Sequence, residues 1–173
     1  MSEAPPPPQP PAELRPSQDA LNAVLAVHRA WLISNGTDGS RADLRGVDLH
    51  GRSLWRADLR RARLDGCNLR GADLDHADLS EASLIGACLE RASLWSARLQ
   101  HATLAYAELA GANLDHADLC DADLAETNLT GASLWGARLF GADLRHAEGL
   151  TAEQLATAAD GGDMREASSP AQP

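Results

Sequence analysis

The apolar residues of this chain recur with a period of five. Leucine occupies every fifth position from Leu44 to Leu144, 21 times in succession. The residue two before each leucine is alanine except in four units, where it is Val47, Arg52, Cys67 or Thr127. A period of five fits neither a helix, which repeats every 3.6 residues, nor a strand, whose side chains alternate. The chain must therefore turn regularly, with the leucine and the small residue facing inward and three positions of each unit facing solvent.

A longer repeat indicates how the units stack. The tripeptide Ser-Leu-Trp occurs at 53–55, 93–95 and 133–135, and the segment 71–79 recurs at 111–119 with one change. Forty residues are two turns of twenty, but other divisors of forty fit as well, so the periodicity leaves the number of sides open. Successive coils that pair through backbone hydrogen bonds, as β-strands do, would lie about 4.8 Å apart.

The units also carry a family signature. The pattern A(D/N)LXX appears verbatim at 72–76 and 112–116, and the run from Arg41 to His146 resembles the pentapeptide repeat proteins. This resemblance implies an all-β solenoid, namely a right-handed quadrilateral β-helix. The 21 units would form about five coils, and the flanking sequences add short α-helical caps at both ends. It also implies that the central leucine and the small residue two before it fill the interior. For function the resemblance is much less specific.

Both ends of such a rod need caps, because a β-helix exposes unpaired strand edges and apolar core there. The spacing of apolar residues from Gln18 to Ile33 predicts an amphipathic helix, with Ser17 as its N-cap and residues 35–36 as its stop. The face expected to cover the first coil comprises Leu21, Val24, Leu25, His28, Trp31 and Leu32.

The remaining segments complete the predicted organisation. A capping box at 151–154 predicts a short helix that plugs the other end and stops near Ala159. The proline-rich start of the chain and its polar end carry too little apolar surface to fold alone. The predicted segments are a disordered tail at 1–16, a capping helix at 17–36, the repeat domain at 41–148, a second capping helix at 150–159 and a disordered tail at 160–173.

Charge and cysteine usage narrow the choice of partners. The net charge is −10, and the 15 basic residues are all arginine. This balance argues against direct nucleic-acid binding and favours a basic protein partner, although solubility is the simpler explanation of an acidic surface. Cys67, Cys88 and Cys120 lack the spacing of a zinc or redox motif, which fits a reducing, cytoplasmic compartment. With no signal peptide and no run of 18 apolar residues, no membrane contact is expected.

Four-sided coils would bring residues twenty positions apart into one column. The residues Trp55, Asp75, Trp95, Asp115 and Trp135 would then stack on one side of the rod, and we name them the tryptophan column. Because tryptophan is enriched at binding hot spots, this column is a candidate anchor for a partner protein. The competing explanation is that a duplicated forty-residue cassette copied its own surface.

Two histidines flank the aspartates of the tryptophan column. His76 and His116, next to Asp75 and Asp115, suggest a metal site or an acid–base pair. Histidines two coils apart, about 10 Å at strand spacing, cannot share one metal ion. The chain also has no nucleophile elbow, phosphate-binding loop or metal-ligand cluster. We therefore expect a non-enzymatic protein without catalytic residues, metal or cofactor.

Charge varies around the rod and along it. The column next to the tryptophans alternates in sign through Asp78, Arg98, Asp118 and Arg138. This ladder is expected to fix the coil register, with each exposed pair contributing less than about 1 kcal/mol. Residues 41–70 hold eight arginines and four acids, whereas residues 71–137 hold eleven acids and two arginines. The rod is therefore basic at its N-terminal end and acidic beyond.

The acidic stretch supports an alternative function. Some pentapeptide repeat proteins protect DNA gyrase and topoisomerase IV by mimicking duplex DNA, so the resemblance implies a type II topoisomerase as an alternative partner. The acids available for mimicry are Asp73, Asp75, Asp78, Glu81, Glu108, Asp115, Asp118, Asp121, Asp123 and Glu126. Against this, the central position is always leucine, the C-terminal end is polar and the first coils are rich in arginine. The leading hypothesis is a protein-interaction or scaffold surface, with the tryptophan column and Asp118, Asp121 and Asp123 as candidate contacts.

Overall fold

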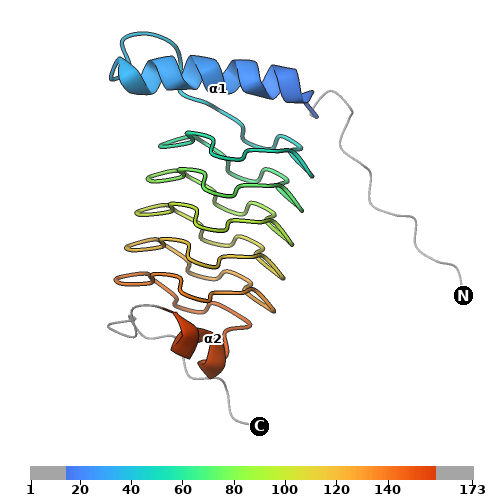
Figure 1. Ribbon diagram of the computed structural model, residues 1–173, viewed down its shortest axis with the longest axis vertical. Helices are drawn as coiled ribbons and strands as arrows, with labels where there is room; N and C mark the ends of the chain where they lie inside the picture. The colour runs from blue at the N-terminus through green and yellow to red at the C-terminus, as the bar shows by residue number, and fades with distance from the viewer. Residues whose placement is uncertain (1–14, 159–173) are drawn as a thin grey trace, which may run out of the picture.

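The protein is a column of stacked turns with a helix at each end (Figure 1). A computed structural model describes residues 15–158. Its helices are α1 (Gln18–Ile33) and α2 (Ala152–Thr157). The predicted tails lie outside the described residues, except for Arg15 and Pro16. Arg15 does not belong to a free tail, because its guanidinium donates to the His50 carbonyl at 3.1 Å.

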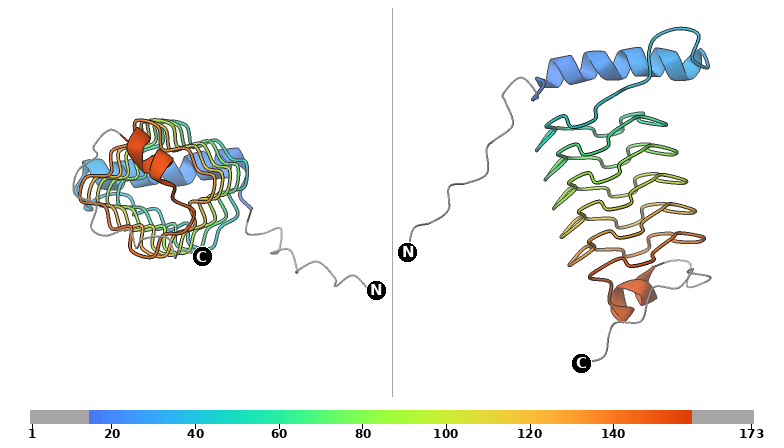
Figure 2. Two further views of the ribbon diagram at one scale, coloured as in Figure 1. Left: turned by 90° about the horizontal axis from the view of Figure 1, so that it is seen from below. Right: turned by 180° about the vertical axis from the view of Figure 1, so that it is seen from behind.

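The backbone between the helices winds in regular coils. Eighteen parallel β-bridges each join a residue to the one twenty positions further on, from the pair Asp43 and Arg63 to the pair Asn128 and Glu148. Every bridging residue directly precedes a leucine, or stands in that position in the final unit. One coil therefore comprises four units of five and has four sides, which answers the question that the periodicity left open. Viewed along the axis, the coils superpose (Figure 2).

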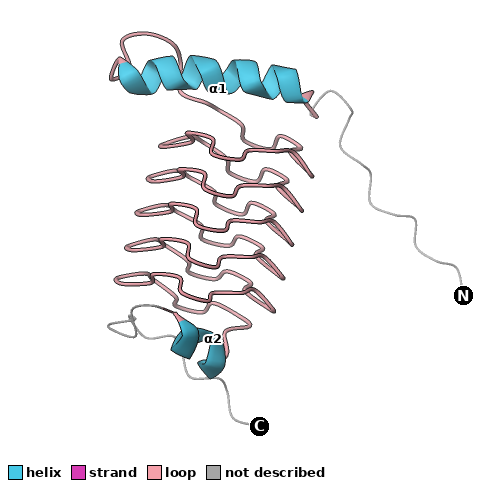
Figure 3. Ribbon diagram, viewed as in Figure 1, coloured by secondary structure: helices cyan, strands magenta, loops and turns pink. Residues whose placement is uncertain are grey.

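The prediction of β-strands was wrong in one respect. Each β-contact is one residue long, and the described residues contain no strand (Figure 3). The cause is a turn after every leucine: at Leu94, for example, the carbonyl accepts a 3.0 Å hydrogen bond from the Ala97 N–H. Between coils the backbone remains fully paired at this unit, since the Ser93 N–H donates to the Ala72 carbonyl and the Leu94 N–H to the Asn113 carbonyl. The fold is therefore a solenoid of bridges and turns.

Each turn places the second residue after the leucine in the left-handed region. The φ values at these corner positions run from 54° to 72°, and twelve of the corners are occupied by a residue other than glycine. Such a conformation costs an L-residue on the order of 1 kcal/mol or more and persists only where the surroundings fix it. Here the inter-coil hydrogen bonds fix it. Each corner side chain is thereby held in one direction.

The interior consists of leucine and small residues. All 21 leucines of the repeat are at most 4% exposed. Cys67 and Thr127 replace alanine and are fully buried, and the Thr127 hydroxyl donates to the Leu124 carbonyl at 2.7 Å. Burial raises the pKa of the Cys67 thiol to about 12, so this side chain remains a neutral part of the core. Val47 and Arg52 stay partly exposed because they lie in the first coil, at the end of the rod.

The helix α1 lies across the first coil (Figure 1). The Ser17 hydroxyl accepts a hydrogen bond from the Ala20 N–H at 3.1 Å and so caps the helix. Leu21 and His28 are completely buried beneath it, whereas Val24 remains 38% exposed. The predicted apolar face therefore covers the first coil only in part.

The loop after α1 passes so close to the helix that only glycine fits at one position. A Cβ on Gly39, whose φ is 74°, would lie 2.4 Å from the Val27 carbonyl oxygen and 2.8 Å from the Trp31 nitrogen. We expect Gly39→Ala to lower the free energy of unfolding by about 2–4 kcal/mol, from backbone strain and overpacking together. Guanidinium unfolding followed by circular dichroism measures this.

The matched control for this change is Gly51→Ala. Gly51 also has a positive φ, 63°, but a Cβ there would meet nothing within 4 Å. This variant should lose only the strain, on the order of 1 kcal/mol. Equal losses in the two variants would show that the contact with α1 contributes nothing.

The helix α2 covers the other end. Its capping box is present: the Gln154 N–H donates to the Thr151 hydroxyl at 3.1 Å, and the Thr151 N–H donates to the Gln154 side chain at 2.7 Å. The Gln154 amide also donates to the Ala132 carbonyl of the preceding coil at 2.6 Å. The helix ends at Thr157, two residues before the predicted end at Ala159, which lies outside the described residues. No helix between residues 15 and 158 is long and apolar enough to cross a membrane.

Candidate interaction surface

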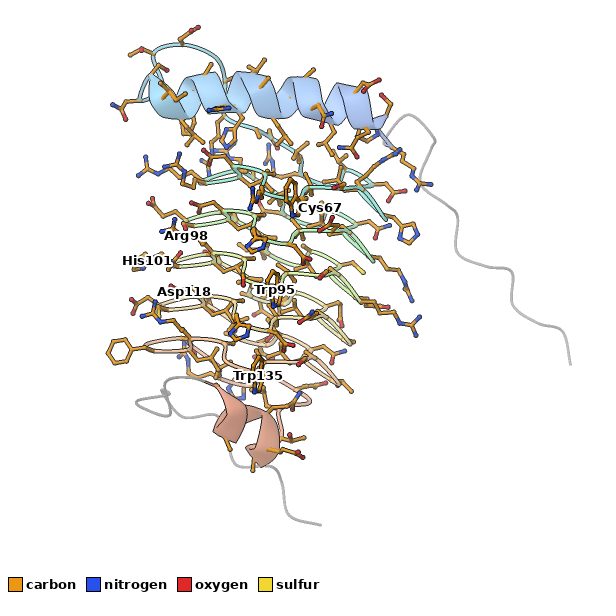
Figure 4. The ribbon with its side chains drawn as sticks, in the orientation of Figure 1. Cys67, Trp95, Arg98, His101, Asp118 and Trp135 are labelled. Carbon is orange, nitrogen blue, oxygen red and sulfur yellow. The ribbon has the colours of Figure 1, made fainter. Side chains whose placement is uncertain are left out.

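The tryptophan column is present in the structure, because residues twenty positions apart lie next to each other in successive coils. The backbone N–H of Trp95 donates to the Asp75 carboxylate at 3.0 Å, and the backbone N–H of Trp135 donates to the Asp115 carboxylate at 3.1 Å. The three tryptophans remain solvent-exposed, at 53% for Trp55, 40% for Trp95 and 58% for Trp135. Figure 4 shows Trp95 and Trp135 one above the other on the same side. The contacts made by these residues with a partner stay a prediction.

The two aspartates of the column have structural partners. The Asp75 carboxylate accepts the Trp95 N–H and the Ser93 hydroxyl of the next coil. Asp115 accepts the equivalent groups, the Trp135 N–H and the Ser133 hydroxyl. These bonds hold each Ser-Leu-Trp segment in place. The aspartates therefore fix the backbone that carries each of these tryptophans.

Histidine rings fill the spaces between the tryptophans. The ring centroids of His76 and Trp95 are 4.7 Å apart at an interplanar angle of 78°. Those of Trp95 and His116 are 6.4 Å apart at 81°, and those of His116 and Trp135 are 4.6 Å apart at 75°. We call these four residues the aromatic ladder. Edge-to-face pairs of this kind contribute about 0.5–1.5 kcal/mol each beyond their buried area, so the ladder restrains its tryptophan rings.

Two further residues adjoin the aromatic side chains of this column. The Arg56 guanidinium lies 4.5 Å from the centre of the Trp55 ring, a cation–π contact at the first coil. At the other end Gly136 leaves room for a histidine, because a Cβ there would lie 2.8 Å from Nδ1 of His116. In the sequence His76 and His116 suggested acid–base chemistry, whereas the structure places Trp95 between them. No group of three side chains suited to a metal ion occurs among residues 15–158.

The charge ladder lies on the adjacent side, where Figure 4 marks Arg98 and Asp118. Arg98 and Asp78 approach to 3.8 Å, and Arg138 and Asp118 to 2.7 Å. Asp118 also accepts from the Gln100 amide at 2.7 Å. Burial alone would raise the pKa of Asp118, but hydrogen bonds from Cys120 and the nearby Arg138 hold it below its ordinary value. Asp118 is thus a fixed, ion-paired carboxylate.

The other two predicted acidic contacts differ from each other. The Asp123 carboxylate accepts the Ala125 N–H at 3.0 Å, which fixes a turn. Asp121 stands exposed at a left-handed corner with φ 56°. Of the four acids Asp115, Asp118, Asp121 and Asp123, three have structural roles. Asp118 is held by an ion pair, whereas Asp115 and Asp123 accept hydrogen bonds from neutral N–H and O–H groups.

Open hollows flank α1 at the N-terminal end. One of about 440 Å³ is lined by Val24, Val27 and Arg41, among others. A second, of about 490 Å³, is lined by polar groups that include Arg29 and Arg56. Their presence follows from the incomplete cover that α1 provides.

These features define a four-sided solenoid of five-residue units that presents aromatic side chains along one column of turns. A family model for pentapeptide repeats matches eight copies, in residues 57–95, 92–119 and 107–145. The chain belongs to the pentapeptide repeat family, as its signature predicted. Members of this family form right-handed quadrilateral β-helices, in agreement with the four sides seen in this chain.

Solved structures of the family resemble this chain. A pentapeptide repeat protein from the cyanobacterium Cyanothece 51142 is 30% identical over 58% of this chain and 85% of its own, with a TM-score of 0.50. HetL, involved in heterocyst differentiation regulation in Nostoc sp. strain PCC 7120, is 34% identical over 62% of each chain, with a TM-score of 0.32. QnrB1, a plasmid-mediated fluoroquinolone resistance protein, is 23% identical over 61% of this chain and 59% of its own, with a TM-score of 0.37. No curated protein sequence matches the chain.

Proposed function

We propose that this protein is a non-enzymatic interaction module, a rod of about five coils whose tryptophan side binds a partner protein. The observation that carries the proposal is the aromatic ladder, which holds two half-exposed tryptophans, Trp95 and Trp135, in edge contact with histidines. Tryptophan is prominent among residues that dominate binding energy. A large apolar ring that is already immobilised loses little conformational entropy when a partner covers it.

The charge of this side indicates the kind of partner. Asp73, Asp75 and Asp115 lie on the tryptophan side, and none of the three has an ion pair with a described residue. Arginine enters this side only at the first coil, as Arg52 and Arg56. An acidic surface with exposed aromatic rings favours a partner whose contact region is neutral or basic.

The DNA-mimic hypothesis receives less support from the geometry. A mimic of duplex DNA needs regularly spaced, unpaired negative charges like those of the phosphate backbone. Arg61 pairs with Glu81 at 2.9 Å, and Arg138 with Asp118 at 2.7 Å. Such pairs reduce the negative field that a DNA-binding groove would meet, so we place the tryptophan side first.

The test is affinity capture with the full chain and a double variant, Trp95→Ala with Trp135→Ala. We expect the wild type to retain a protein that the variant releases, with at least about a 30-fold rise in Kd, the loss of one hot-spot contact. Isothermal titration with the identified partner measures Kd. Circular dichroism of both chains checks that the solenoid remains folded.

Two further variants separate the tryptophan side from other surfaces. The matched control is Tyr106→Ala with Phe140→Ala, which removes aromatics that are 63% and 55% exposed on other parts of the rod. It should bind like the wild type. The second of these variants carries Asp118→Asn, Asp121→Asn and Asp123→Asn. A partner that the triple Asp→Asn variant releases and the tryptophan variant retains would contradict our proposal and favour the acidic surface.

A further inference from the structure

The spacing of the tryptophans restricts the shape of whatever binds them. Trp55, Trp95 and Trp135 occupy the same position of the five-residue unit in every second coil. With coils about 4.8 Å apart, successive tryptophans are separated by about 9.6 Å, and the outer two by about 19 Å. A regular ligand must therefore present a side chain to the same face about every 9.6 Å.

A polyproline II helix meets this requirement best among the common backbone conformations. It has three residues per turn and rises about 3.1 Å per residue, so residues i, i+3 and i+6 share one face at intervals of about 9.3 Å. In an extended β-strand three residues span about 10 Å, but side chains three apart point to opposite faces. An α-helix returns to one face after two turns, about 10.8 Å, so over three contacts it overshoots the column by about 2 Å.

The chain itself contains a segment with this spacing. Residues 5–11 read PPPPQPP, so Pro5, Pro8 and Pro11 are three residues apart. In a polyproline II helix these three prolines lie on one face, and the outer two are about 19 Å apart. This distance equals that between the outer tryptophans.

The structure shows where this segment joins the rod. Arg15 donates to the His50 carbonyl at 3.1 Å and approaches Asp48 to 3.9 Å. The Gln18 side chain donates to the Ser53 carbonyl at 2.9 Å and accepts the Ser53 N–H at 3.3 Å. Ser53 lies two residues before Trp55. The chain therefore enters the fold at the turn formed by residues 50–51, one side of the coil before the turn that carries Trp55.

A short connection joins the two parts. Residues 12–14 separate Pro11 from Arg15, and four residue steps of extended chain reach at most about 13–14 Å. A segment that starts at Arg15 and runs along the tryptophan side meets Trp55 first and Trp135 last.

We propose that residues 5–11 lie along the tryptophan column as a polyproline II helix, with Pro11 on Trp55, Pro8 on Trp95 and Pro5 on Trp135. This inference rests on the proposed function, because it names the ligand class of the same surface: a proline-rich segment. Aromatic-lined surfaces bind such segments well, since a preformed polyproline helix loses little entropy on docking. The chain's own segment then competes with a partner for the tryptophans.

Tryptophan indole N–H signals in nitrogen-15 spectra of the full-length chain test the proposal. The register variant carries Pro5→Ala, Pro8→Ala and Pro11→Ala, and the matched control carries Pro6→Ala, Pro7→Ala and Pro10→Ala. Both lose three prolines from the same segment. We expect the signals of Trp55, Trp95 and Trp135 to move in the register variant and to stay near the wild-type positions in the control. Trp31, on α1, serves as the internal reference.

Two outcomes would overturn the proposal. Equal signal positions in both variants and the wild type would mean that the segment does not touch the column. Shifts that grow with protein concentration would identify the occupant as the segment of a second copy, whereas docking within one chain is independent of concentration.

Partner capture separates this inference from the proposed function. If the segment covers the column half of the time, the register variant binds the partner about twofold tighter than the wild type. Tryptophan-dependent capture with unchanged indole signals would reject the docked segment and leave the interaction module standing. Register-specific signals without any tryptophan-dependent capture would reject the partner and leave a column that serves only its own chain.

Discussion

Replacing Leu94 by alanine is expected to lower the free energy of unfolding by about 3–5 kcal/mol, the upper part of the range for buried leucines. Leu94 is completely buried. Its coil is held on both sides by backbone hydrogen bonds, from the Leu74 N–H to the Ser93 carbonyl and from the Leu94 N–H to the Asn113 carbonyl. These bonds set the distance between coils, so the neighbouring coils cannot move in to fill the cavity left by the missing side chain. The free energy cost of the cavity is therefore not relieved.

The matched control is Ile85→Ala, which shortens an aliphatic side chain that is 44% exposed on the outside of the rod. It should change stability by less than about 1 kcal/mol. Guanidinium unfolding followed by circular dichroism compares the two variants. A loss at Ile85 as large as that at Leu94 would contradict a core made of inward-facing leucines.

The second large effect is expected at His28, which joins α1 to the first coil. Its Nδ1 accepts the Ala42 N–H at 3.1 Å, so Nε2 carries the proton and donates to the Arg60 carbonyl at 3.1 Å. The ring also stacks on Trp31, with centroids 5.7 Å apart. In His28→Ala the buried Ala42 N–H and the part-buried Arg60 carbonyl lose their partner, which costs up to about 1–3 kcal/mol each. We expect a total loss of about 3–5 kcal/mol once the cavity is included.

Thermal unfolding of His28→Ala measures this loss, and His50→Ala, which truncates an exposed histidine, is its control. The control should melt near the wild-type temperature. If the His28 variant did the same, the helix α1 would contribute little to the stability of the rod.

The same histidine should also make the cap sensitive to acid. Burial lowers the pKa of His28 below its ordinary value, with Arg41 and Arg60 acting in the same direction and the Arg60 carbonyl and Asp58 opposing them. The unfolded chain therefore binds the proton first. The stabilisation is complete above about pH 6.5, the unfolded value, and is lost as the pH falls through the lower folded pKa.

The variant His28→Gln isolates this titration, since glutamine can accept from Ala42 and donate to Arg60 without ionising. Wild-type melting temperature should fall as the pH drops below about 6.5, while that of the variant should stay level until carboxylates titrate. The pKa values of Asp43 and Asp58 are held low by hydrogen bonds from Arg45 and Arg60, so their contribution is lost only in stronger acid. A variant as acid-sensitive as the wild type would rule out His28 as the cause.

The sequence predicts the core and the coiling well because every unit repeats the same pattern. Leucine at every fifth position can be buried only by a chain that turns every five residues, and all 21 are buried. The spacing around Leu21 likewise predicts a helix at 18–33, which are the bounds of α1. The four sides could not be read from the period, because that number depends on which coils pair, and the offset between bridged residues decides it.

The interaction surface was predictable only in outline. The sequence places three tryptophans in one column, but it does not show that Asp75 turns toward the Trp95 N–H. The role of His76 was missed because the direction of its side chain depends on a left-handed backbone, with φ 59°. A signal was present, since this corner position is glycine in nine of 21 units and so marks a positive φ. A positive φ at this position directs the side chains of both histidines toward the tryptophan rings.

The backbone of the rod repeats every coil, whereas its tryptophans repeat every second coil. These two periods determine which insertions and deletions of coils preserve the tryptophan column. Excising the codons of a single coil, for example those of residues 71–90, would remove His76 and bring Trp55 directly against Trp95. Excising or duplicating two coils, for example residues 71–110, leaves Trp135 next to the coil that carries Asp115 and His116. A change of rod length in steps of two coils therefore preserves the spacing of the tryptophans. Each added block of two coils extends the column by about one turn of a proline-rich ligand.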